Sequence, residues 1–167
     1  MLVGGCDVGS TTGKAAVIDD SSIVAHFIMP STTKPEETAH TAMGEAVKMA
    51  GLGSIDELDY IVGTGYGRRK VAFANENISE ITCHARGAHW LEPGVRTVVD
   101  IGGQDCKVIS LDENGKVIEF VMNDRCAAGT GRFFEAMARV LDCGLDGISS
   151  LEMQGPTAAT ITSQCSV

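Results

Sequence analysis

Two segments of the chain combine an aspartate, a glycine turn and a lysine at the same spacing. Residues 7–14 read DVGSTTGK, and residues 100–107 read DIGGQDCK. Glycines let the backbone turn so that N–H groups converge and form a nest for an anion. A carboxylate at the end of a strand can hold Mg²⁺ directly or through water. An ordinary hairpin also needs a glycine turn, but two copies at matched places favour a site for phosphates.

A third segment, residues 122–133, places Cys126 on a loop between a strand and a helix. The start of a helix offers N–H groups and the positive end of the helix dipole, which stabilise a thiolate or an anionic cluster. The glycine-rich run that includes Gly129 and Thr130 could also contact a phosphate. A buried cysteine beside a helix cap accounts for the same residues, so both interpretations stay open on this segment alone.

The elements that position these residues form an internal repeat. Residues 2–29 align with residues 95–122 without gaps, and seven of the 28 positions are identical. In each copy an apolar strand enters the glycine turn, a second strand follows (15–18 or 108–111), and a third comes after a polar turn (23–28 or 117–122). Turn residues between β-branched runs are typical of hairpins. Each copy is therefore predicted to be a three-stranded meander.

Helical patterns separate and follow the two copies. Pro35 suits the first turn of a helix that carries small apolar residues on one face until Gly51. Residues 58–62 read as a further strand that enters a glycine-rich run, Ser79 can cap a second helix, and a third helix is expected after Gly131. This alternation predicts an α/β fold of two related lobes, residues 1–94 and 95–167.

Composition excludes several classes of protein. Of the 167 residues, 44% are hydrophobic and 21% are charged, as in a soluble globular protein. A net charge of -9 argues against binding to nucleic acid. No apolar run approaches the roughly 18 residues of a membrane span, and no signal-peptide pattern is present, so a cytoplasmic location is expected. The six cysteines contain no C-x-x-C pair, which excludes zinc ribbons and thioredoxin-like sites.

Paired D-x-G hairpins in repeated halves resemble the actin/Hsp70/sugar-kinase superfamily. The resemblance implies two ribonuclease-H-like lobes that bind ATP or ADP in a cleft between them. Together with residues 78–87, the Cys126 segment and residues 163–167, the second hairpin resembles the BadF/BadG/BcrA/BcrD ATPases. These include the ATP-dependent activators of 2-hydroxyacyl-CoA dehydratases. Members of this family continue beyond the position of Val167, so we expect a fragment with an incomplete second lobe.

The family resemblance implies a homodimer that holds one [4Fe-4S] cluster, with Cys126 and Cys165 as the ligands from each subunit. It implies ATP-dependent transfer of one electron from a ferredoxin or flavodoxin to a dehydratase. Asp7, Asp100 and Asp105 would position Mg²⁺ or the attacking water. The residues expected to bind nucleotide phosphates are Ser10, Thr11, Thr12, Gly13, Lys14, Gly102, Gly103, Gln104, Gly129 and Thr130.

Three other functions fit parts of the pattern. An ATPase subunit of a benzoyl-CoA reductase belongs to the same family and would stay bound to its reductase component. A small-molecule kinase of the same superfamily would not need Cys126 or Cys165. A nucleotide-binding module would bind ATP without turnover. Co-purification with a reductase would identify the first of these. Anaerobic purification would identify the second, because an iron–sulfur protein is brown and a kinase is colourless. The coding sequence beyond codon 167 would test the third.

Overall fold

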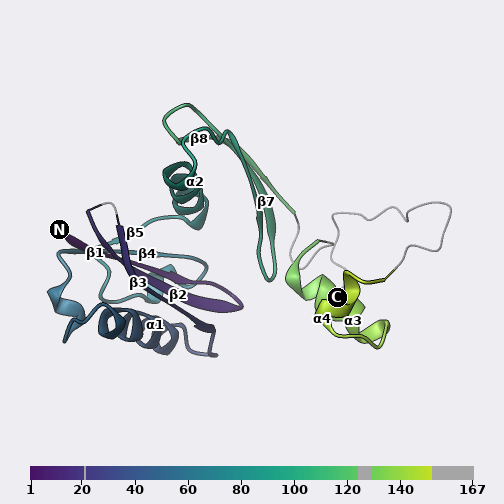
Figure 1. Ribbon diagram of the computed structural model, residues 1–167, viewed down its shortest axis with the longest axis horizontal. Helices are drawn as coiled ribbons and strands as arrows, with labels where there is room; N and C mark the ends of the chain where they lie inside the picture. The colour runs from purple at the N-terminus through teal and green to yellow at the C-terminus, as the bar shows by residue number, and fades with distance from the viewer. Residues whose placement is uncertain (21, 124–128, 152–167) are drawn as a thin grey trace. The chain divides into compact units, whose positions relative to one another are not determined.

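The computed structural model describes residues 1–20, 22–123 and 129–151. The chain divides into two compact units, Met1–His84 and Ala85–Val167, and each unit contains one β-sheet (Figure 1). The two glycine turns of the repeat lie in different units, so each is described with its own sheet.

The sheet of the first unit has five strands in the order β3-β2-β1-β4-β5. Strands β1 (Leu2–Val8), β2 (Thr12–Asp19) and β3 (Ser22–Pro30) form an antiparallel meander. Strand β4 (Tyr60–Thr64) pairs in parallel with β1, and the short β5 (Glu76–Asn77) pairs in parallel with β4. The meander predicted from the first copy of the repeat is confirmed.

Helix α1 (Pro35–Met49) covers the core of this sheet, and Pro35 begins it as predicted. The buried face of α1 carries Ala39, Ala42, Met43 and Ala46, which share one apolar cluster with residues of β1 and β2. Alternate residues of β1 and β2 point into the cluster, as the period of a strand requires. This packing fixes the strands that enter and leave the first glycine turn.

Strand β4 lies two residues later than the predicted strand at 58–62. A capping box formed by Ser54 and Glu57 starts the short helix η1 (Ile55–Glu57), and the N–H of Leu58 still bonds to the carbonyl of Ile55. Leu58 is therefore buried as the last residue of a turn instead of the first of a strand. The later register extends β4 to Thr64, which pairs with Asp7.

The second unit repeats the antiparallel meander with β6 (Thr97–Ile101), β7 (Cys106–Leu111) and β8 (Val117–Met122). The register also repeats, because Asp7 opposes Lys14 as Asp100 opposes Lys107. Each meander has one register shift, which falls after Val17 in β2 and after the equivalent Ser110 in β7. The duplication seen in the sequence is therefore a duplication of strand pairing.

The remaining helices are α2 (Glu80–Leu91), α3 (Gly131–Val140) and the short α4 (Leu145–Ile148). The N–H of Thr82 donates to Oγ of Ser79, so the predicted cap of α2 is confirmed. The helix predicted after Gly131 is α3. Within the described ranges, none of the helices combines the length and the apolar character that a membrane span needs.

The buried Cys6 leads to a testable pH dependence. Burial, with a smaller contribution from the charge of Asp7, raises the pKa of the Cys6 thiol from 9.0 to about 12. The unfolded chain then ionises before the folded chain, so stability is complete below pH 9 and falls as the pH rises towards 12. By pH 10.5 this group is expected to reduce the free energy of unfolding by about 2 kcal/mol.

Urea unfolding between pH 8 and 11 measures this effect in the wild type and in Cys6→Ala. The variant starts with a cavity and a lower stability, but its stability should fall less steeply with pH. Parallel pH profiles for the two proteins would show that Cys6 is not the group responsible.

Candidate functional site

The first glycine turn joins β1 to β2 and is fixed by backbone bonds on both sides. The N–H of Gly9 donates to the carbonyl of Thr12 at 3.0 Å and closes the turn. Ser31 braces it, because its Oγ donates to the carbonyl of Gly9 at 2.8 Å and its N–H donates to the carbonyl of Thr11 at 2.9 Å. A Cβ at Gly9 would lie 2.9 Å from the Thr12 carbonyl oxygen, so the turn needs glycine.

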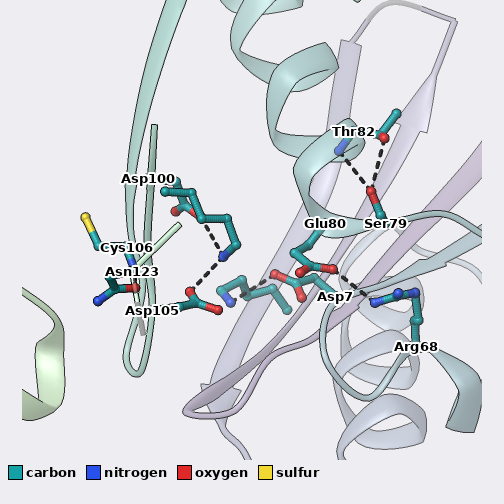
Figure 2. A network of polar contacts seen from close by, with 11 residues as sticks. Asp7, Arg68, Ser79, Glu80, Thr82, Asp100, Asp105, Cys106 and Asn123 are labelled. Atoms are coloured by element: carbon teal, nitrogen blue, oxygen red, sulfur yellow. Dashed lines mark hydrogen bonds and ion pairs between the residues drawn. The ribbon is translucent and has the colours of Figure 1, made fainter. Parts of the chain in front are cut away.

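Lys14 and Asp7 face each other beside this turn. The Nζ of Lys14 donates to Oδ2 of Asp7 at 3.0 Å, and Figure 2 shows the carboxylate of Asp7 with this contact dashed. The Lys14 side chain is 41% exposed. Its ammonium group therefore balances the carboxylate, while a large part of the side chain remains in contact with solvent.

The second glycine turn holds a lysine with two carboxylates. The N–H of Gly102 donates to the carbonyl of Asp105 at 2.8 Å, as in the first turn. The Nζ of Lys107 lies 3.3 Å from Oδ2 of Asp100 and 2.7 Å from Oδ1 of Asp105 (Figure 2). The Lys107 side chain is only 3% exposed. The repeat aligns Lys107 with Lys14, but the sequence pattern alone assigns no role to Lys107.

The charge of Lys107 is kept by its partners. Burial lowers the pKa of Lys107, but the hydrogen bond to Asp105 and the charges of Asp105 and Asp100 outweigh it, so the pKa is raised overall. Asp105 occupies the position of Thr12 in the repeat. The second turn therefore has two carboxylates for one ammonium group, and the first turn has one of each.

Oxygen ligands of this kind fit Mg²⁺. Within the described residues, no group of three or more His, Cys, Asp or Glu side chains could by itself hold a metal ion. Mg²⁺ is commonly bound by one or two carboxylates, with waters and substrate phosphates as the other ligands. The aspartates Asp7, Asp100 and Asp105 match that requirement, provided that a phosphate is bound beside them.

The start of α3 is bonded directly to the second glycine turn. The N–H groups of Gly131 and Arg132 donate to the carbonyls of Gly102 and Gly103 at 3.0 and 2.9 Å. Thr130 is fully buried, and its hydroxyl accepts from the N–H of Phe133 as the cap of the helix. These two N–H groups at the start of α3 are thus used within the protein, which the spacing of the residues does not predict.

A glycine loop after β4 lies against Asp7. Gly65 has a φ of +88°, and a Cβ there would overlap Oδ1 of Asp7 and lie 2.6 Å from the carbonyl oxygen of Val8. The N–H of Gly67 donates to the same carbonyl of Val8 at 2.8 Å. Only glycine combines this backbone conformation with this close approach. The glycine-rich run was visible in the sequence, but its contact with Asp7 was not.

The structure divides the predicted site residues between the two units. It brings Asp7 together with Lys14, and it brings Asp100 together with Asp105 through Lys107. Ser10 is exposed at the first turn. The predicted iron ligands Cys126 and Cys165 lie outside the described residues.

Comparison with known proteins gives matches over almost the whole chain. The model of the BadF/BadG/BcrA/BcrD ATPase family matches residues 5–167. The activator of lactoyl-CoA dehydratase from Anaerotignum propionicum is 43% identical over 167 residues, which are 100% of this chain and 64% of that protein.

Two solved structures also match almost the whole chain. The (R)-2-hydroxyglutaryl-CoA dehydratase component A of Acidaminococcus fermentans has a TM-score of 0.85 and 36% identity, over 99% of this chain and 63% of that one. The activator of the 2-hydroxyisocaproyl-CoA dehydratase from Clostridium difficile, solved with bound ADPNP, has a TM-score of 0.82 and 38% identity, over 99% of this chain and 61% of that one.

The chain therefore spans less than two thirds of the length of these relatives. A ROK hexokinase from Thermus thermophilus, 14% identical with a TM-score of 0.54, shares the fold alone. The predicted fold of the actin/Hsp70/sugar-kinase superfamily is confirmed.

Proposed function

Because the chain belongs to the BadF/BadG/BcrA/BcrD ATPase family, we propose that it hydrolyses ATP to drive the transfer of one electron to a 2-hydroxyacyl-CoA dehydratase. The relatives named above are dehydratase activators, which supports this choice of partner. The observation that carries the nucleotide part is the repeated hairpin, in which a glycine turn lies beside an aspartate–lysine pair in both units.

The two turns would bind the phosphates of the nucleotide. Backbone N–H groups in a turn of this kind form an anion nest, and hydroxyl and ammonium groups add further donors. In the first turn these donors come from Ser10, Thr11, Thr12, Gly13 and Lys14. In the second unit they come from Gly103 and Gln104, with Gly129 before the start of α3. The N–H of Gly102 closes the turn and the buried Thr130 caps α3, so these two residues would shape the site and not donate to the phosphate.

The carboxylates would hold Mg²⁺ against the phosphates. The second hairpin keeps one negative charge after pairing with Lys107, which favours a divalent cation at Asp100 and Asp105. Asp7 is balanced by Lys14 and would position the metal or the attacking water. When bound, Mg²⁺ would neutralise charge that develops on the phosphate oxygens during hydrolysis.

We also propose that Cys126 and Cys165 ligate iron at the interface of a homodimer. A [4Fe-4S] cluster takes four thiolates, and two cysteines per chain supply four across a two-fold axis. This cluster would provide the one-electron chemistry, with a ferredoxin or flavodoxin as donor. A reducing cytoplasm would keep these thiols available. The support here is the sequence and the family, because both cysteines lie outside the described residues.

Anaerobic purification tests this function directly. We expect a brown protein with about four iron atoms per pair of chains, and ATP hydrolysis that requires Mg²⁺. Addition of a reduced donor and ATP should then activate a 2-hydroxyacyl-CoA dehydratase. An iron-free protein that phosphorylates a sugar would show that the proposed function is wrong.

Substitution of Cys126 tests the proposed binding of iron separately from the proposed binding of ATP. Cys126→Ser should lose nearly all bound iron, because the hydroxyl of serine is a poor substitute for a thiolate ligand, and it should keep its affinity for ATP. Cys143→Ser is the control, since Cys143 is a partly buried free cysteine in the second unit. Iron analysis and equilibrium binding of a fluorescent ATP analogue give the two readouts. Iron at the wild-type level in Cys126→Ser would remove this residue from the site.

A further inference from the structure

The loop Gly65–Arg68 forms one wall of the position occupied by the Asp7 carboxylate. Lys14 bonds Oδ2 of Asp7, and the backbone of Gly65 packs directly against Oδ1. The position of Gly65 therefore decides how far this carboxylate can rotate. Since both Gly65 and Asp7 belong to the first unit, this relation is fixed within one compact body.

Arg68 holds Gly65 in place. One guanidinium nitrogen of Arg68 donates to the carbonyl of Gly65 at 2.9 Å, and the N–H of Arg68 lies 3.2 Å from the same oxygen. At the other end of the loop, Gly67 is bonded to Val8, which follows Asp7 in β1. Within the loop, the carbonyl of Gly65 is thus held by Arg68, and the N–H of Gly67 is held by strand β1.

Glu80 holds Arg68. Its Oε2 lies 3.0 Å from the same guanidinium nitrogen, and Figure 2 shows the two side chains joined. Both side chains are partly buried, at 33% and 24% exposure, so solvent screens the pair less than it screens a surface ion pair. Glu80 is the first residue of α2, and the capping bond of Ser79 fixes this end of the helix.

We infer that Arg68, held by Glu80, is a positioning residue for Asp7. The guanidinium group keeps the carbonyl of Gly65 and the loop against Oδ1, so that the Asp7 carboxylate stays in one orientation towards bound Mg²⁺. Arg68 acts through Gly65 and does not itself touch the metal or the phosphates. This inference rests on the proposed ATP function.

Loss of the bond between the Arg68 guanidinium group and Gly65 should weaken the binding of Mg²⁺ more than the binding of the nucleotide. Without the guanidinium group, the carbonyl of Gly65 keeps the longer bond to the backbone N–H of Arg68, so the loop holds Oδ1 of Asp7 less firmly. Lys14 bonds the other oxygen, Oδ2. Residues that orient a metal ligand typically contribute about 10- to 100-fold to metal affinity or activity. The backbone N–H groups that would bind phosphate stay in place, because Ser31 braces the first turn independently of Arg68.

Arg68→Gln in the full chain is the test, with Arg69→Gln as its control. Arg69 is the exposed neighbour, so its substitution removes the same charge from the next position. Binding of a fluorescent ADP analogue is measured in EDTA and across a Mg²⁺ titration. We expect Arg68→Gln to raise the half-saturating Mg²⁺ concentration about tenfold and to leave the affinity in EDTA within about twofold. Arg69→Gln should match the wild type in both.

Glu80→Gln provides a second variant that keeps a neutral hydrogen-bond acceptor for Arg68. Its half-saturating Mg²⁺ concentration should lie between those of the wild type and Arg68→Gln, and it decides the question if Arg68→Gln does not fold. Unchanged Mg²⁺ dependence in both variants overturns the inference, as does an equal loss of affinity with and without Mg²⁺. A wild-type protein that binds no nucleotide would instead overturn the proposed function, and this inference with it.

Discussion

Replacement of Lys107 by methionine is expected to lower the free energy of unfolding by about 3 kcal/mol. The change removes the ammonium group from a nearly solvent-free position and leaves Asp100 and Asp105 facing each other without a cation. The cost comes from the two carboxylates, which repel each other once the buried cation between them is removed. Trp90, the only tryptophan of the chain, lies in the same unit, so its fluorescence in urea follows this unfolding.

The repeat supplies the control for this experiment. Lys14→Met removes the equivalent lysine, but its side chain is 41% exposed and bonds one carboxylate. The first turn has one carboxylate where the second has two, so no repulsion between carboxylates follows the change, and we expect a loss of about 1 kcal/mol or less, followed by circular dichroism in urea. Equal losses in the two variants would mean that the buried position of Lys107 adds nothing to its contribution to the free energy of unfolding.

Replacement of Asp7 by asparagine is expected to reduce Mg²⁺-dependent ATP hydrolysis about 100-fold. Asparagine has nearly the same shape and still offers an oxygen to Lys14, so the first turn should keep its structure. It lacks the negative charge that would hold Mg²⁺ or orient the attacking water. The rate is measured as phosphate release at saturating ATP, and thermal unfolding checks that the variant is folded.

Asp19→Asn is the matched control for the Asp7 variant. Asp19 is the last residue of β2, at the end of the hairpin away from the glycine turn, and its side chain is 55% exposed. Its hydrolysis rate should equal that of the wild type. A wild-type rate in Asp7→Asn would mean that the first turn has only a structural role.

The parts of the fold that the sequence predicted are those set by local patterns. Alternating apolar residues and polar turns gave both meanders, and a proline and a glycine bounded α1. The repeat also aligned Asp100 and Lys107 with Asp7 and Lys14, and the strand register that joins each pair is the same in both hairpins. These features depend on residues close together in the chain, so their spacing is visible in the sequence.

The remaining parts depend on packing between distant segments. Nothing in the spacing shows that Lys107 is buried while Lys14 is exposed, because the surroundings of the two turns set this difference. Arg68 and Glu80 are 12 residues apart, and they meet because the segment before α2 returns to β4, where the N–H of Ile78 bonds to the carbonyl of Gly63. The predicted start of β4 at residue 58 was wrong for a related reason. Leu58 ends the capped turn of η1, so the strand begins two residues later.

The bonds between the second turn and α3 imply an electronic link as well as a positional one. The carbonyl of Gly102 belongs to the same peptide group as the N–H of Gly103, and the carbonyl of Gly103 shares its group with the N–H of Gln104. A peptide group that donates to an anion is polarised and becomes a stronger acceptor at its oxygen. A phosphate held by these N–H groups would therefore tighten the two bonds to Gly131 and Arg132, and its departure would loosen the first turn of the helix.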